Sequence, residues 1–108
     1  MANRHLARTI AMQTLYEWDF NHARNKEMTR EALREITKRN IGEFGPGLEE
    51  SEFVYELIDG TLDHQKEIDS LIATYAPEWP LEQITTVDRN VLRLGVYELR
   101  FSSNIPAK

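Results

Sequence analysis

The segment from residue 86 to 101 constrains the fold more than any other part of this chain. Apolar side chains occur on almost every side of the helix that it predicts, for which Thr85 or Thr86 is the candidate cap. Such a helix is typical of the middle of a bundle, because on a surface many of these side chains would meet water. The apolar residues are Val87, Val91, Leu92, Leu94, Val96, Tyr97, Leu99 and Phe101.

Three earlier segments also show the helical spacing of apolar residues. We predict helices over residues 3–20 with Asn3 as the cap, over 30–41 with Thr29 as the cap, and over 49–75 with a kink or break between Gly60 and His64. The glycine- and proline-rich stretches 42–47 and 76–80 are predicted to be loops, and residues 81–84 at most one helical turn. With no strand pattern, the chain is predicted to be an all-α bundle of about five helices.

The composition excludes several classes of protein. The 108 residues correspond to a single domain, and none of them is a cysteine, which rules out disulfides, thiolate metal sites and a cysteine nucleophile. The three histidines fall in separate predicted elements, so we expect no metal, no cofactor and no catalytic activity. No apolar run approaches the roughly 20 residues that span a bilayer, and the first residues lack a secretory signal, so a cytoplasmic location is expected.

Charge is distributed unevenly along the chain. The net charge is -5, yet the segment 49–82 alone holds ten acidic residues and one lysine, so the remainder is positive. Arg89, Arg93 and Arg100 are spaced to form a basic ridge on the last helix. An anionic partner can therefore dock on the positive side, although most of these charges are also explained as solvated helix faces.

Two kinds of binding remain open. Arg4 and Arg8 lie four residues apart and project from one side of the first helical turns beside His5, a pattern that suits RNA phosphates. Large aromatic residues and the acidic Glu82 and Asp88 near the last helix suit a protein partner. Core packing of the aromatics, and stabilisation of the helix dipole by Asp88, are the simpler alternatives.

Two segments of the sequence resemble the NusB family. Arg4-His-Leu-Ala-Arg8 with Ala11-Met-Gln-Thr-Leu-Tyr16 is similar to the opening helix of that family. Val87-Asp-Arg-Asn-Val-Leu-Arg-Leu-Gly-Val-Tyr-Glu-Leu99, followed by Ile105-Pro-Ala-Lys108, resembles its most characteristic segment. The resemblance implies an all-helical protein of bacterial transcription antitermination. Such a protein pairs with NusE, a small-subunit ribosomal protein, binds boxA RNA in ribosomal RNA operons, and acts with RNA polymerase without a cofactor.

The resemblance also assigns roles to individual residues. It implies RNA contacts at Arg4, His5 and Arg8, extended by Arg89 and Lys108, and NusE contacts at Tyr16, Glu82 and Asp88. Arg93 and Glu98 match structural positions of the core helix. The RNA segment has two arginines and a histidine where some family members have a denser basic run, which implies weaker RNA binding or more reliance on the partner.

A second departure concerns length. After the Ile-Pro-x-Lys motif the family continues for about two helices, so residues 1–108 are expected to form a single NusB-like domain truncated at its C-terminus. Residues 87–101 would then expose apolar surface and favour aggregation, swapping or a homodimer. Two other hypotheses are the NusB-like N-terminal domain of a ribosomal-RNA cytosine methyltransferase, and a helical interaction module that does not bind RNA.

Overall fold

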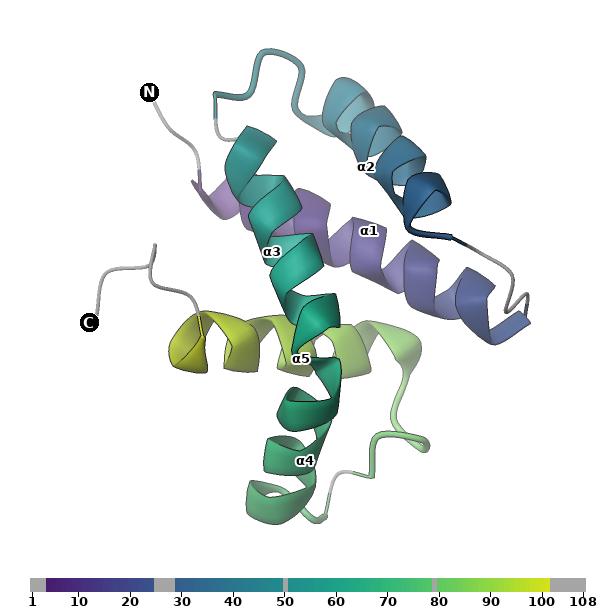
Figure 1. Cartoon of the computed structure of the whole chain (residues 1–108), viewed down its shortest axis with the longest axis vertical. Helices are drawn as coiled ribbons and strands as arrows, with labels where there is room; N and C mark the ends of the chain where they lie inside the picture. Colours follow the sequence, from purple (N-terminus) through teal and green to yellow (C-terminus); the bar gives the residue numbers. More distant parts are fainter. Residues whose placement is uncertain (1–3, 25–28, 50, 79, 102–108) are drawn as a thin grey trace.

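The chain folds into helices joined by short turns (Figure 1). A computed structural model describes residues 4–24, 29–49, 51–78 and 80–101. Within these ranges there are five helices and no strand, which confirms the predicted all-α class. None of the described helices is both long and apolar enough to cross a membrane. The helices are α1 (Arg4–Arg24), α2 (Arg30–Phe44), α3 (Ser51–Asp63), α4 (Gln65–Tyr75) and α5 (Thr86–Arg100).

Threonine side chains begin two of the helices. The Thr29 hydroxyl accepts a hydrogen bond from the Ala32 amide at 3.1 Å, and the Thr85 hydroxyl accepts one from the Asp88 amide at the same distance. Each bond satisfies a backbone donor that has no partner within its own helix. Both caps were predicted, with Thr85 now selected over Thr86, whereas Asn3 lies outside the described residues.

The prediction that a loop begins at Gly42 is wrong. Helix α2 continues through this glycine to Phe44, three residues beyond its predicted end. A single glycine inside a helix costs only about 1 kcal/mol, which neighbouring helical residues outweigh. The helix ends where Pro46 follows Gly45, because a proline disfavours the helical conformation in the residue before it.

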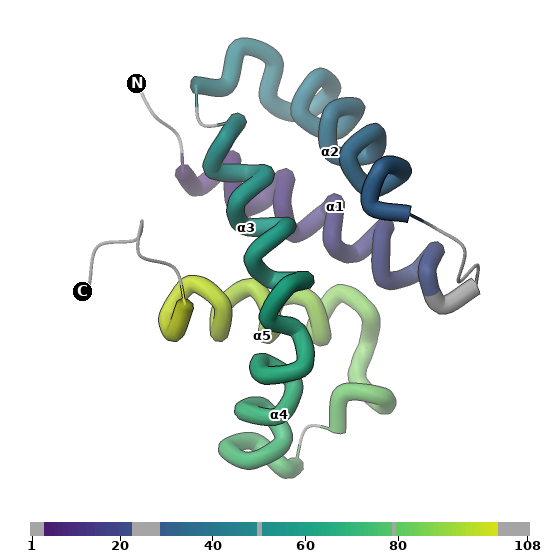
Figure 2. The backbone as a smooth tube through the Cα atoms, viewed as in Figure 1, coloured from purple at the N-terminus to yellow at the C-terminus, as the bar shows by residue number. Residues whose placement is uncertain are grey.

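The long helical pattern over residues 49–75 is divided at His64, within the predicted interval. Helix α3 ends at Asp63 and α4 begins at Gln65, and the His64 ring stacks on Phe101 with 4.3 Å between ring centroids. Helices α3 and α4 together form a column that crosses α1 and α5 (Figure 2). Helix α4 stops at Tyr75, before the prolines, as predicted.

One hydrophobic core joins the helices. Helix α1 packs against α2, α3 and α5, and α5 also contacts α3 and α4. The buried apolar residues come from all five helices: Ala7, Ile10, Ala11, Leu15, Leu33, Phe53, Val54, Leu57, Ile58, Ile68, Ile72, Leu94 and Tyr97.

Helix α5 is not enclosed as its sequence predicted. Leu94 and Tyr97 face the core, but Val87 and Val91 are 43% and 46% exposed, and Leu99 is 91% exposed. Helices α1, α3 and α4 cover one side of α5, and no other described element packs on the opposite side. The expected exposure of apolar surface on residues 87–101 is therefore present.

The predicted basic ridge on α5 is not exposed along its whole length. Arg93 is only 8% exposed, and its guanidinium donates to both carboxylate oxygens of Asp69 at 2.8 and 2.9 Å. Asp19 of α1 accepts further bonds from Arg93 at 3.3 Å and from Arg89 at 2.8 Å. Two of the three arginines therefore tie α1, α4 and α5 together, and only Arg100 is exposed.

Tyr97 packs where α3 and α5 cross. A Cβ added to Gly60 would lie 2.2 Å from the Tyr97 ring, so only a glycine leaves room for it. The Tyr97 hydroxyl donates to Glu56 at 3.0 Å. Burial, reinforced by this bond and by the nearby carboxylates of Glu56, Asp63 and Glu98, raises the pKa of Tyr97 to about 12.

Replacing Arg93 by alanine should destabilise the protein strongly. The change leaves the Asp69 carboxylate without its bidentate partner and removes one of the three donors to Asp19, and breaking a buried ion pair in this way costs about 3 kcal/mol or more. Urea unfolding followed by circular dichroism measures the loss. Arg100→Ala removes the same charge from an exposed site of the same helix and should change stability by less than about 0.5 kcal/mol. Equal unfolding midpoints for the two variants would contradict the proposed role of the network.

The two substitutions Gly60→Ala and Gly42→Ala should have opposite effects. At Gly60 the new methyl group collides with Tyr97, so we expect a loss of about 2 kcal/mol from overpacking. At Gly42 nothing lies within 4 Å, and the change should add up to about 1 kcal/mol through helix propensity. Thermal melting distinguishes them, and a Gly60→Ala protein that melts at or above the wild-type temperature would refute the close packing.

Candidate nucleic-acid and partner interface

The first two turns of α1 bring three basic residues to one end of the molecule. His5 is exposed, and the side chains of Arg4 and Arg8 both extend over the ring of Phe53 from α3. Their guanidinium carbons lie 4.3 and 5.7 Å from the ring centroid. Such cation–π contacts hold the long side chains against α3 while leaving the charged groups at the surface.

Arg8 is oriented by a carboxylate of α5. Its Nε donates to Glu98 at 2.7 Å, and the Glu98 side chain is only 14% exposed. Among the described residues this is the only hydrogen bond of the Arg8 side chain, which is 37% exposed, so its two terminal amino groups are not engaged by another described side chain. A guanidinium held by Nε presents a fixed pair of donors, which is the geometry that grips a phosphate.

The other two residues assigned to RNA do not join this cluster. Arg89 donates to Asp19 at 2.8 Å and to the Leu81 carbonyl at 2.9 Å, and little of its side chain is exposed. Asp19 lies eleven residues further along α1 than Arg8, roughly 16 Å at the rise of a helix. Lys108 lies outside the described residues.

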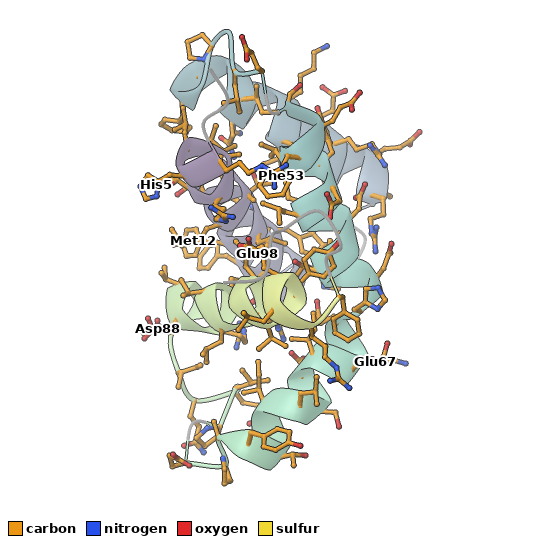
Figure 3. All side chains as sticks on the ribbon, turned by 90° about the vertical axis from the view of Figure 1, so that its left-hand side faces the viewer. His5, Met12, Phe53, Glu67, Asp88 and Glu98 are labelled. Atoms are coloured by element: carbon orange, nitrogen blue, oxygen red, sulfur yellow. The ribbon has the colours of Figure 1, made fainter. Side chains whose placement is uncertain are left out.

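The residues assigned to a protein partner lie on the outer side of α1 and α5. Tyr16 is half-buried on α1 and stacks on Phe20 at 6.2 Å, whereas Asp88 in the first turn of α5 is exposed. Glu82 is exposed in the turn before α5. We call this surface the α1–α5 face; it comprises Met12, Tyr16, Phe20, Val87, Val91, Gly95 and Leu99. Figure 3 shows His5, Met12 and Asp88 along this side, at the left, away from α3 and α4.

The two helices of this face run antiparallel, and polar contacts fix both ends. Arg8 bonds Glu98 near one end, and Asp19 accepts hydrogen bonds from Arg89 and Asn90 near the other. The α1–α5 face therefore has a basic end at the start of α1 and an acidic end at the start of α5. Within the described part of the chain no group of three metal-binding side chains occurs.

The sequence did not indicate that Phe53 belongs to the basic end, and it did not indicate which residue Glu98 contacts. Phe53 follows the helical spacing of apolar residues in the segment 49–75, and nothing local to it indicates that two arginines lie over its ring. Glu98 was matched to a structural position, but its partner Arg8 is 90 residues away in sequence. Only the tertiary packing of α1 with α3 and α5 makes either contact.

The sequence profile of the NusB family matches residues 5–108. The chain belongs to the NusB family. This confirms the resemblance drawn from its first and last segments. No solved structure matches the chain.

Several NusB relatives match almost the entire chain. The protein named transcription antitermination protein NusB from Elusimicrobium minutum strain Pei191 is 39% identical over 94% of this chain and 68% of its own length. Its namesake from Desulforamulus reducens is 37% identical over 95% of this chain and 66% of its own length. The NusB protein of Myxococcus xanthus strain DK1622 is 34% identical over the whole chain and 74% of its own length.

Proposed function

We propose that this NusB-family chain acts in transcription antitermination by binding boxA RNA together with NusE. The complex would support read-through by RNA polymerase in ribosomal RNA operons. The observation that carries this proposal is the basic end of the α1–α5 face, where Arg4 and Arg8 lie over Phe53 and His5 is exposed in the same helical turns. The names of the relatives, all transcription antitermination proteins, support the same process.

The RNA would contact the first turns of α1. Arg8 offers two terminal amino groups to a phosphate while Glu98 fixes its plane. Arg4 contributes a second guanidinium beside Phe53, and the exposed His5 adds a ring N–H donor. The net charge of -5 does not oppose this contact, because screening confines each charge to about 10 Å at ordinary salt.

Arg89 and Lys108 belong to this proposal in a secondary role. For Arg89 to reach RNA it would have to leave Asp19 and the Leu81 carbonyl. In the folded chain those bonds join the turn before α5 to α1, and they hold that turn in place beside the proposed partner site.

The partner would contact the middle and the acidic end of the α1–α5 face. Tyr16 supplies an aromatic surface, and Glu82 and Asp88 are exposed carboxylates. This combination suits a basic protein with an apolar anchor, as a ribosomal protein such as NusE offers. An interaction module without RNA binding is the second candidate, favoured by the exposed apolar residues of the same face.

Removing both arginines should weaken RNA binding. We expect Arg4→Ala/Arg8→Ala to lower the affinity for a boxA RNA at least about tenfold. The affinity should also depend less steeply on salt, because a protein that makes fewer phosphate contacts releases fewer counterions when it binds. Fluorescence anisotropy with and without NusE measures both quantities. The matched control, Arg34→Ala/Lys38→Ala, removes the same charge at the same spacing from exposed positions of α2.

Three outcomes of this titration decide between the candidates. NusE should raise the affinity of the wild type, and the α2 control should bind nearly as well as the wild type. If the two double variants bind equally, general charge and not α1 holds the RNA. If the wild type shows no binding with or without NusE, the interaction module without RNA is favoured instead.

Glu98→Ala tests whether Glu98 affects RNA binding through net charge or by orienting Arg8, because the two explanations predict opposite changes in affinity. Removing a carboxylate near the RNA should tighten binding if only net charge matters, whereas it should weaken binding about fivefold if Glu98 orients Arg8, since one hydrogen bond is worth about 1 kcal/mol. Glu52→Ala removes an exposed charge from the first turn of α3, next to Phe53, and should not weaken binding. Glu98→Gln keeps an acceptor and should restore part of the affinity. Tighter binding by Glu98→Ala would exclude the orienting role.

A further inference from the structure

Helix α2 is held in the fold by a single neighbour. It lies at the edge of the molecule and packs closely on α1, and none of the other described helices packs on it to a comparable extent (Figure 1). Of the residues that form the hydrophobic core, only Leu33 comes from α2, fewer than from any other described helix. Burial of apolar surface, the main force that holds helices together, is therefore small for α2. Its outer side is charged, which suits water and not a further helix, and the exposed residues there are Glu31, Arg34, Glu35 and Lys38.

The buried side of α2 is largely polar. Its buried residues are Leu33, Thr37 and Asn40, and Asn40 is only 1% exposed. The side-chain amide of Asn40 donates to the Thr14 hydroxyl at 3.0 Å and to the Glu17 carboxylate at 2.7 Å, both on α1. We call Thr14, Glu17, Thr37 and Asn40 the polar layer between α1 and α2. An interface that contains such a layer gains less from the exclusion of water than an apolar interface does.

The polar layer does not oppose separation of the two helices as an apolar core would. The Thr14 and Thr37 hydroxyls each donate to a carbonyl one turn earlier in their own helix, at 2.9 and 2.8 Å. These two bonds survive when the helices part. The two bonds from the Asn40 amide are lost, but water replaces them, because Asn40 and its acceptors are then solvated. Opening therefore leaves no polar group of the layer without a partner.

Other polar contacts of α2 are exposed ion pairs. Arg30 and Arg34 reach α3, where they pair with Asp59 at 3.7 and 3.0 Å. Arg39 pairs with Glu17 of α1 at 2.6 Å. The three arginine side chains are 47%, 58% and 50% exposed, and exposed pairs contribute little to stability and are screened by salt. These pairs orient α2 but hold it weakly.

The turn after α2 provides a fixed pivot. Gly45 is buried against α1, and a Cβ there would lie 2.8 Å from Cδ1 of Ile10, closer than a side chain allows. Pro46 and Gly47 follow, and Gly47 has a φ of 79°, which glycine adopts without strain. Changes of φ and ψ at a few such residues let one element move relative to another. Helix α2 can therefore move away while the turn stays on α1.

From the single neighbour, the polar layer, the exposed ion pairs and the pivot, we propose that α2 opens reversibly from α1 as a unit while α1, α3, α4 and α5 stay folded. The opening uncovers the side of α1 around Thr14. Because a helix turns by about 100° per residue, this side lies opposite Met12 and Tyr16 of the α1–α5 face. Elements that move when a protein binds a partner are drawn from such weakly held units. The proposal does not depend on RNA or NusE binding.

Hydrogen exchange of the full chain, followed by mass spectrometry, tests whether α2 opens alone. We expect amides in the middle of α2 to exchange at least about a hundredfold faster than those in the middle of α1 and α3. Leu33→Ala should accelerate α2 further, because it removes the core side chain of that helix. Ile72→Val is the control, since it weakens the core at α4, which does not pack closely on α2. It should accelerate the well-protected amides of the other helices and leave α2 unchanged, because the closed and open states lose the same stabilisation.

A second pair of variants tests the polar layer. Asn40→Leu replaces the buried amide by an apolar side chain of similar size, while Thr14 and Glu17 keep other hydrogen-bond partners. This variant should slow the exchange of α2 at least about tenfold, because opening then exposes a second apolar side chain. Lys38→Leu places the same side chain on the exposed side of α2 and should not slow it. Circular dichroism verifies that all variants keep the helical content of the wild type.

The proposal is overturned if the amides of α2 are as well protected as those of α1 and α3. It is also overturned if Ile72→Val accelerates α2 as much as the other helices, since α2 then opens only when the whole chain unfolds. Equal exchange of α2 in Asn40→Leu and the wild type would show that the polar layer is not the cause of the weak docking.

Discussion

The ion network around Asp19 is the interaction on which the rest of the structure depends. Asp19 of α1 accepts hydrogen bonds from Arg89, Asn90 and Arg93 of α5, and Arg93 continues to Asp69 of α4. These contacts fix which residues of α1 and α5 lie opposite each other, because a shift of one helical turn would leave buried charges unpaired. With that register set, Arg8 meets Glu98 near the other end of the pair, and the basic end of the α1–α5 face is oriented as a consequence.

The network also explains how α5 can stay packed on α1 while apolar residues on its outer side are exposed. Packing on α3 and α4 buries Leu94 and Tyr97, and the charged contacts hold α5 on α1 without requiring cover on its outer side. The contacts that stabilise the described helices therefore lie on the inner side of α5.

Local chemistry in the sequence predicted much of the fold. The caps at Thr29 and Thr85, the break near His64 and the end of α4 before the prolines each depend on residues within a few positions of one another. Apart from the loop predicted at Gly42, the errors arose where distant residues decide the outcome. Spacing alone placed Arg89 and Arg93 on a common ridge, but their partners Asp19 and Asp69 lie in other helices and turn that ridge inward. Similarly, an apolar pattern does not tell which of its sides a neighbouring helix will cover.

The candidate site also combines features that nearby residues determine with contacts that only the tertiary fold makes. The spacing of Arg4 and Arg8 was visible in the sequence, but the contacts that orient them, Phe53 and Glu98, come from α3 and α5.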